Sequence, residues 1–305
     1  MDSDRSRTFI PNRFKEHVKS DNEADKYLFS NSRNDFVIYS IETWLKHLTP
    51  PIYPHRKSVT SFLFLSSGHA EKTCGLDKYE VERNCVMVVP QGYLTSTPTI
   101  SSDATGFYFH FDFSIFPVWP IQNLKKMFPF LFTDEHPLFV LDEVSSKAVI
   151  FLLQRLELEY LNNREALDFN LISSYLVCAF QEMKLFYPDE HSAKSSRNSQ
   201  ITSEFKELLY NGIKDSKSAA EFAEKLNISP NHLNKSVKAT TGKTAKELIN
   251  EALILEAKNL LFETELSIGE VALEVGLEDP AYFSRLFRQH SGMTPQQFRK
   301  MIEKS

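Results

Sequence analysis

Cysteine and glycine are both scarce in this sequence of 305 residues, which contains three cysteines and nine glycines. Cys74, Cys85 and Cys178 are odd in number and lack C-x-x-C spacing, which argues against a disulfide framework and against a zinc site. The low glycine content leaves little material for phosphate-binding loops, and no G-x-S-x-G nucleophile motif is present. We therefore predict three buried thiols and no common catalytic motif.

Long apolar runs are also absent, since no stretch approaches 18 consecutive apolar residues. The first residues, MDSDRSRTFIPNRFKEH, carry charges throughout and lack the apolar segment of a signal peptide. With 42% hydrophobic and 25% charged residues, the composition is typical of a globular protein. We expect a soluble cytoplasmic protein without a membrane partner, and the length favours two domains.

One helix is specified by its own sequence, EDPAYFSRLFRQHSGMTP at 278–295. Asp279 suits the N-cap, Pro280 suits the first helical position, and Gly292 suits the left-handed residue that ends a helix. Apolar residues recur at i, i+3, i+4 and i+7, which predicts one buried face made of Phe283, Leu286, Phe287 and His290.

The other face of this helix is basic. Between Pro280 and Lys300 there are four basic residues and no acidic one, a local charge of 4 − 0 = +4. The formal net charge of the chain is −5, so a nucleic-acid partner is not indicated by the total. Phosphate contacts depend on a local patch, however, and a second segment free of acid runs from Asn231 to Lys243. A solvated amphipathic helix is the alternative interpretation of each segment.

These two basic segments belong to an internal repeat that starts at Ser218 and again at Ser267. Ser218, Glu221 and Ala223 match residues 49 positions later, and after one inserted residue the offset becomes 50. The later matches pair Lys235 with Arg285 and Gly242 with Gly292. Each copy predicts a short helix, a tight turn and a second capped helix, which is the helix-turn-helix pattern.

The segment between the copies, TAKELINEALILEAKNLLFETE, predicts a single helix of roughly 18 residues, or about 27 Å. Such a helix can hold two recognition helices about one turn of B-DNA apart, roughly 34 Å. Both could then enter major grooves on the same side of a duplex.

On these motifs, residues 201–305 resemble the DNA-binding domain of AraC/XylS-type bacterial transcription regulators. The most specific stretch is SIGEVALEVGLEDPAYFSRLFRQHSGMTPQQFRK, which is close to the second helix-turn-helix of that family and its G-x-[ST]-P-x-x-[FY]-R tail. Two positions depart from the family pattern, which usually has Arg where Ala252 stands and Phe where Val237 stands.

The resemblance implies a set of DNA-contacting residues. Base contacts are expected from the second recognition helix at Ala281, Tyr282, Ser284 and Arg285, and from the first at Asn231, Asn234 and Lys235. Phosphate contacts are expected from Lys238 and Arg288. The side chains suit these roles, because Arg and Lys pair with guanine and Asn pairs with adenine in the major groove.

The first 190 residues have a different pattern. Short apolar runs such as SVTSFLFLSSG, KYEVERNCVMVVPQG and GFYFHFDFSIF alternate with turn residues and predict antiparallel strands in a sandwich or small barrel. In the last run, Phe107, Phe109, Phe111 and Phe113 should point to one side, and Tyr108, His110 and Asp112 to the other. Two amphipathic helices and then a polar linker at 191–200 should follow.

This half resembles, through Pro54–His55–Arg56, Gly68 and the VPQG at 89–92, the cupin-type effector-binding and dimerisation domain of many family members. The predicted fold class is therefore α+β with two domains: a cupin-like antiparallel barrel with two helices at 1–190, and an all-α domain with two helix-turn-helix motifs and a linker helix at 201–305. The candidate effector-binding residues are His55, Arg56, Phe64, Tyr79, Tyr93 and Phe109. An ordinary barrel core is the alternative explanation for the aromatic ones.

A metal site in such a barrel would need an H-x-H pair, a Glu and a distant His on one face. His55 is followed two residues later by Lys57, and Thr95 stands where a further His would follow VPQG. His69, Glu71 and His110 do not have the required spacing. We therefore predict neither a metal nor another cofactor, and no catalytic residues.

The sequence favours a transcription regulator, an activator in our interpretation, with double-stranded DNA and a small-molecule effector as partners. We also expect a homodimer and name RNA polymerase as a further candidate partner. A face formed by Leu152, Leu153, Leu156 and Tyr160 is the candidate dimer seam, with packing on the barrel as its alternative. Two rival hypotheses are a metal-dependent cupin enzyme with a DNA-binding tail and a DNA-binding protein that needs no effector.

Overall fold

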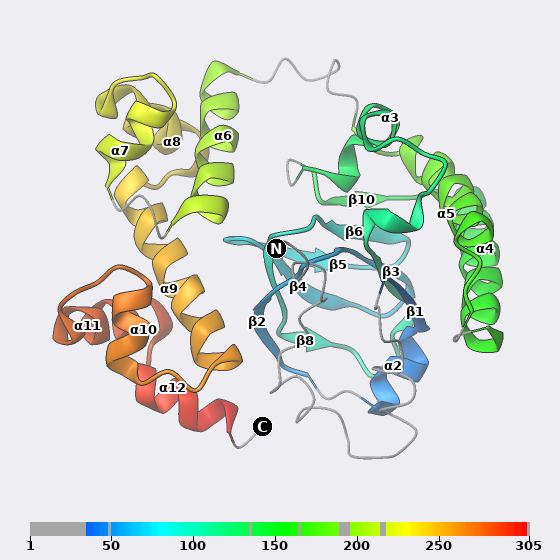
Figure 1. Cartoon of the computed structure of the whole chain (residues 1–305), viewed down its shortest axis with the longest axis horizontal. Helices are drawn as coiled ribbons and strands as arrows, with labels where there is room; N and C mark the ends of the chain where they lie inside the picture. The colour runs from blue at the N-terminus through cyan, green and yellow to red at the C-terminus, as the bar shows by residue number, and fades with distance from the viewer. Residues whose placement is uncertain are drawn as a thin grey trace, which may run out of the picture. The chain divides into compact units, whose positions relative to one another are not determined.

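In a computed structural model of the chain, the structure describes residues 35–47, 50–133, 136–163, 166–188, 196–213 and 218–303. Contacts divide the chain into two compact units: the described residues within 35–52 and 56–188 form the first, and those within 53–55 and 196–303 form the second. The first unit combines antiparallel strands with helices, and the second contains helices (Figure 1). The predicted α+β class with a helical C-terminal domain is confirmed.

Apart from residues 53–55 of β2, the sheets belong to the first unit. Its strands are β1 (Phe36–Ser40), β2 (Ile52–Arg56), β3 (Thr60–Ser67), β4 (Ala70–Cys74), β5 (Asp77–Val81), β6 (Cys85–Val89), β7 (Leu94–Thr97), β8 (Thr99–Ile100), β9 (Thr105–Phe111) and β10 (Leu138–Val140). They form a five-stranded sheet in the order β1-β9-β3-β6-β10, a pair β2-β7, and a three-stranded sheet β5-β4-β8. Hydrogen bonds from Gly75 N to Leu94 O (2.9 Å) and from Thr95 Oγ1 to Thr73 O (2.7 Å) connect β4 to β7.

The helices of this unit are α2 (Ile41–His47), α3 (Ile121–Met127), α4 (Glu143–Asn162) and α5 (Phe169–Lys184), with 3-10 turns η2 (Phe113–Ile115) and η3 (Pro129–Leu131). Alternation along β9 places the buried residues as predicted, with Phe109 and Phe111 on the face that carries Phe62. Phe62 and Phe111 contact Phe180 of α5, with ring centroids 5.4 and 5.8 Å apart. This side of the sheet is therefore the core beneath α4 and α5 (Figure 1).

The predicted dimer seam on α4 is wrong, because its residues belong to this core. Leu153, Leu156 and Tyr160 are fully buried within their own unit, and Leu152 packs against the same core. The alternative, packing on the barrel, is what the structure shows. A face that is already covered inside one chain cannot also be exposed to a second copy.

Two motifs that the sequence places far apart meet in this unit. The turn 89–92 after β6 lies beside the end of β2, where Gly92 N donates to Lys57 O at 2.8 Å and Lys57 N donates to Tyr93 O at 3.3 Å. The Arg56 guanidinium also donates to Gly92 O. Gly92 of the VPQG segment and Arg56 of the Pro54–His55–Arg56 segment therefore lie in one connected corner of the first unit.

The second unit contains the helices α6 (Arg197–Gly212), α7 (Ala219–Lys225), α8 (Pro230–Thr241), α9 (Ala245–Glu263), α10 (Ile268–Glu274), α11 (Pro280–Ser291) and α12 (Pro295–Ile302). Helix α6 begins inside the segment predicted as linker, with Ser196 as its N-cap, and residues 189–195 lie outside the described residues. Its Phe205 ring lies 5.3 Å from Phe222 of α7, and its Asn198 Oδ1 accepts from Ser236 of α8. The domain boundaries at 190 and 201 stay predictions.

The internal repeat is visible in the hydrogen bonds of the two helix-turn-helix motifs. Ile228 N donates to Ala223 O in the first turn (2.9 Å), and Leu277 N donates to Ala272 O in the second (2.8 Å), an offset of 49. Because the next N-caps, Ser229 and Asp279, are 50 residues apart, the inserted residue lies in the second turn.

No helix among the described residues is long and apolar enough to span a membrane.

Candidate nucleic-acid interface

Helix α11 forms with the boundaries that its sequence predicts. The Asp279 side chain accepts from Ala281 N at 2.8 Å, which caps the helix. Gly292 ends it with a φ of 77°, a left-handed conformation that costs other residues energy, and its N–H donates to Arg288 O. Gly242 ends α8 in the same way with a φ of 74°. Both recognition helices therefore have 12 residues, begin with a proline and end at a left-handed glycine.

One face of α11 holds the motif together. Phe283, Leu286 and Phe287 are buried, and Phe287 contacts both Phe283 (5.8 Å) and Phe298 of α12 (5.6 Å). His290, predicted on this face, is only half-buried. Burial of the aromatic residues fixes the rotation of α11 about its axis, so the opposite face must point outward.

The outward face of α11 carries the residues predicted to contact DNA. Ala281, Tyr282, Arg285 and Arg288 are exposed, and Ser284 is half-buried. Within the described parts of the chain, neither Arg285 nor Arg288 forms an ion pair. Two unpaired guanidinium groups one turn apart form a surface suited to phosphates and base edges.

Helix α8 presents a similar surface with one difference. Asn231, Lys235 and Lys238 are exposed, but Asn234 is half-buried and its Oδ1 accepts from Ala245 N at 3.1 Å. Ala245 is the first residue of α9, and its N–H is one of those that a helix leaves unpaired. Asn234 therefore caps α9, which competes with the base-reading role predicted for it.

The second motif has no need of such a cap. Pro295 stands at the position that matches Ala245 and has no N–H to satisfy. Ser284, the match of Asn234, has no hydrogen-bond partner among the described residues. Its hydroxyl therefore remains available to a ligand.

Acidic side chains from α9 reduce the positive charge of the first motif. Lys243 forms an ion pair with Glu251, with Nζ 2.8 Å from Oε1. Lys238 lies close enough to Glu247 to help lower the pKa of that carboxyl, after the larger effect of the hydrogen bonds from Thr244. The sequence showed no acid between Asn231 and Lys243, but the fold places two acids of α9 beside this segment.

Helix α9 separates the two motifs. It has 19 residues, which corresponds to about 28 Å of helix. Within this unit α7 and α8 lie near one end of α9, and α10, α11 and α12 lie near the other (Figure 1). Neither recognition helix is buried inside the unit, as the predicted double interface requires.

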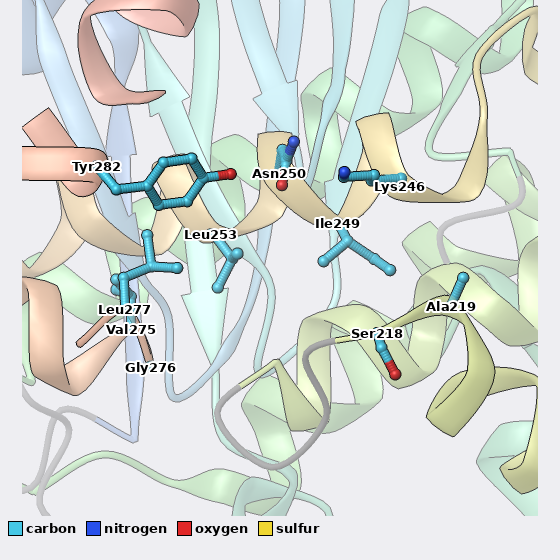
Figure 2. Close-up of a pocket in the computed structure, with 10 residues that line it drawn as sticks. All are labelled: Ser218, Ala219, Lys246, Ile249, Asn250, Leu253, Val275, Gly276, Leu277 and Tyr282. Carbon is cyan, nitrogen blue, oxygen red and sulfur yellow. The ribbon is translucent and has the colours of Figure 1, made fainter. Parts of the chain in front are cut away.

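A pocket of about 260 Å³ lies between the motifs along α9 (Figure 2). Its lining includes Ser218 of the α7 N-cap, Ile249 and Leu253 of α9, and Tyr282 of α11. In Figure 2 the Tyr282 hydroxyl and the Lys246 ammonium both point toward Asn250. No motif in the sequence pointed to Lys246 and Asn250, although their i, i+4 spacing on α9 puts them on one face.

The predicted effector residues fall into two groups. Phe64 and Phe109 are fully buried in the core beneath the helices, so the structure gives them a packing role and adds no support for ligand contact. Tyr79 on β5 is half-buried, and Tyr93 lies in the corner with Arg56. The Nδ1 atom of His55 is 2.8 Å from Tyr53 O. Among the described residues, no three His, Cys, Asp or Glu side chains are placed to hold a metal.

Comparison with known proteins agrees with this geometry. A helix-turn-helix domain family matches residues 222–301, from α7 to α12. The chain is 28% identical over 125 residues to the uncharacterized HTH-type transcriptional regulator YisR of Bacillus subtilis, which covers 41% of this chain and 44% of YisR. It is 32% identical over 97 residues to the transcriptional activator RhaR of Salmonella dublin, covering 32% and 34% of the two chains.

These matches support the resemblance of residues 201–305 to the DNA-binding domain of AraC/XylS-type transcription regulators. Among solved structures, the C-terminal domain of AraT, a response regulator from Geobacillus stearothermophilus, is 28% identical with a TM-score of 0.32 and covers 36% of this chain and 88% of that one. The matches span less than half the length of the curated relatives. The family match is therefore confined to the second unit, where it covers residues 222–301.

Proposed function

We propose that this protein is a sequence-specific DNA-binding transcription regulator that contacts two adjacent major grooves through α8 and α11. The observation that carries the proposal is the pair of matched recognition helices, each with a buried apolar face and an exposed basic face. Arg285 and Lys235 occupy matching positions and are assigned to base edges, whereas Arg288 and Lys238 are assigned to phosphates.

The pocket between the motifs extends this interface. A duplex that follows both recognition helices must pass its backbone across α9, where Lys246, Asn250 and Tyr282 offer donors. We assign Lys246 to a phosphate in this position. Lys246→Met should weaken binding to all sequences alike and reduce the slope of log K against log salt by about one.

A direct test captures genomic fragments on the purified full chain, sequences them and footprints the enriched site. The proposal predicts two protected half-sites about one helical turn apart on one side of the duplex. Capture of fragments without a shared sequence would contradict it.

The remaining parts of the proposal concern regulation. We propose that the protein acts in the cytoplasm and that a small molecule bound in the first unit changes how the half-sites are engaged. Activation, with RNA polymerase as a partner, is proposed from the likeness to RhaR, which is named as an activator. Reporter transcription with and without the regulator gene would show the sign.

Dimerisation is proposed through the outer face of α4, which replaces the buried seam. Val144, Phe151 and Leu158 follow one another at seven-residue intervals and are 77%, 69% and 53% exposed. Such a heptad-spaced stripe fits a second copy of the same helix. In analytical ultracentrifugation, Phe151→Asp should convert a dimer into a monomer. Leu156→Asp is unsuitable as a control, because Leu156 belongs to the buried core. An unchanged dimer would exclude this face.

A further inference from the structure

The first unit contains a group of polar side chains on the face of the sheet that α4 and α5 do not cover. In the antiparallel pair of β3 and β9, Ser61 stands opposite His110 and Leu63 stands opposite Tyr108. Opposite residues point to the same side of a sheet, so Ser61, Tyr108 and His110 share one face. It is the face opposite Phe62, Phe109 and Phe111.

The polar atoms of these side chains are buried and lack partners among the described residues. The Ser61 hydroxyl, the Tyr108 hydroxyl and both ring nitrogens of His110 have no hydrogen bond within the described residues. Burial, followed by the Lys57 charge, holds the pKa of His110 well below its usual value, so the imidazole is neutral. A neutral imidazole has one donor and one acceptor, and both are unused here. Buried polar atoms are normally paired, so four such atoms on one face point to a missing partner.

Lys72 of β4 brings a positive charge to the same region. Its side chain is only 4% exposed, and its Nζ donates to Thr97 Oγ1 at 3.3 Å. It forms no ion pair with a carboxylate in the part of the chain that the structure describes. Burial, followed by the Lys57 charge, lowers the pKa of Lys72 to about 7, against a weaker opposing effect of Cys74. A buried ammonium without a counter-ion is unfavourable and needs compensation.

Lys57 connects the two parts of this group. Its charge acts on both Lys72 and His110, and its Nζ lies 5.4 Å from the centre of the Tyr108 ring. The Trp44 indole stacks on the Tyr108 ring, with ring centroids 6.2 Å apart. The region therefore combines positive charge, unused hydrogen-bonding groups and a flat aromatic surface.

We propose that this face of the first unit binds a small molecule bearing one carboxylate, with Lys72 as its counter-ion and Tyr108, His110 and Ser61 as its hydrogen-bonding partners. The carboxylate neutralises the buried ammonium, and the apolar remainder of the molecule lies against Trp44 and Tyr108. A dianion such as phosphate fits less well, because it would leave surplus negative charge buried. The inference rests on the proposed function, in which this unit binds the effector.

The test measures the melting temperature of the full chain with sodium hexanoate and sodium benzoate, and with hexanamide and benzamide as neutral matches. A carboxylate that binds the native state should raise the melting temperature in a concentration-dependent way, and its amide should not. Lys72→Met should raise the concentration for half-maximal effect by about 10- to 100-fold, the range expected for a lost charged hydrogen bond. Lys78→Met, on the neighbouring strand and exposed, should behave as the wild type.

Tyr108→Phe serves as a second variant, since it removes only the unpaired hydroxyl and keeps the ring stacked on Trp44. It should weaken the response of the same probes by several-fold. The inference is overturned if neither carboxylate raises the melting temperature, if the amides act equally well, or if a folded Lys72→Met responds like the wild type. Gel shifts on the operator distinguish this inference from the proposed function. DNA binding without a carboxylate response overturns only the carboxylate site, whereas a carboxylate response without DNA binding overturns the proposed transcription regulator.

Discussion

The two helix-turn-helix motifs have the same internal skeleton and different outer surfaces. Turn bonds, glycine caps and buried apolar positions match from one motif to the other. On the surface, Arg285 and Arg288 of the second motif form no ion pair with other described residues, whereas Lys243 and Lys238 of the first lie near acids of α9. The two motifs share the buried and capping residues that folding requires. They differ in the exposed residues that a binding partner would contact. We therefore expect the second motif to dominate DNA affinity.

The largest expected difference concerns packing. Phe287 and Val237 occupy matching buried positions, and the Phe side chain fills more space between its neighbours. Phe287→Ala should lower the free energy of unfolding by about 3–5 kcal/mol, and Val237→Ala by about 2 kcal/mol. Chemical denaturation monitored by circular dichroism at the helix band measures the free energy of unfolding of both variants. Equal losses would mean that the two cores are equally filled.

The next difference concerns DNA. Arg285→Ala should weaken specific binding by about 1–3 kcal/mol and relax the preference for one base pair. Lys235→Ala, at the matching position, should cost less because Lys lacks the bidentate geometry of Arg. Gel-shift titrations at fixed salt compare the two variants. Binding by Arg285→Ala at wild-type strength would show that α11 faces the DNA differently.

A smaller effect separates the two possible roles of Asn234. As a cap of α9 it should contribute about 1 kcal/mol to stability, which Asn234→Ala would remove. Ser284→Ala, at the matching position before Pro295, should leave stability unchanged. Thermal melting distinguishes these variants, while a loss of DNA binding by Asn234→Ala without any loss of stability would favour the base-reading role.

The smallest expected effect is a difference in acid sensitivity. Thr244 and Glu247 form a capping box at α9, and the hydrogen bonds from Thr244 lower the pKa of Glu247. A carboxyl whose pKa is lower in the folded state stabilises the fold above its unfolded value of 4.5 and loses this effect as the pH falls through the folded value. At α12 the matching cap uses Gln297, which does not titrate.

Glu247→Gln should therefore reduce the drop in melting temperature between pH 6 and pH 3.5, and Gln297→Glu should increase it. Melting curves at the two pH values measure both changes. If Glu247→Gln leaves the acid-induced drop as large as in the wild type, this capping box is not an acid-sensitive element.

Much of the second unit could be predicted from sequence, because its signals are local. Asp279, Pro280 and Gly292 define α11 within a few residues of one another, and the helical period identifies the buried face. Position along the chain could not show that Asn234 bonds to Ala245 or that Lys243 pairs with Glu251. These contacts depend on how α8 packs against α9, which no local pattern records.

In the first unit local signals were sufficient for β3, β6, β9 and the long helices, whose apolar patterns are strong. Shorter strands such as β4 and β7 are rich in polar residues and could be found only through their partners. The candidate ligand residue Phe109 also shows the limit of local signals. Alternation separates the two faces of β9, but it does not show which face the helices cover.

The most direct measurement is a gel-shift titration on the footprinted operator with base pairs inserted between its half-sites. A rigid α9 that holds α8 and α11 about one turn of DNA apart predicts that five added base pairs, about half a turn, place the half-sites on opposite sides. Affinity should then fall to that of a single half-site. Unchanged affinity would contradict the simultaneous use of both recognition helices.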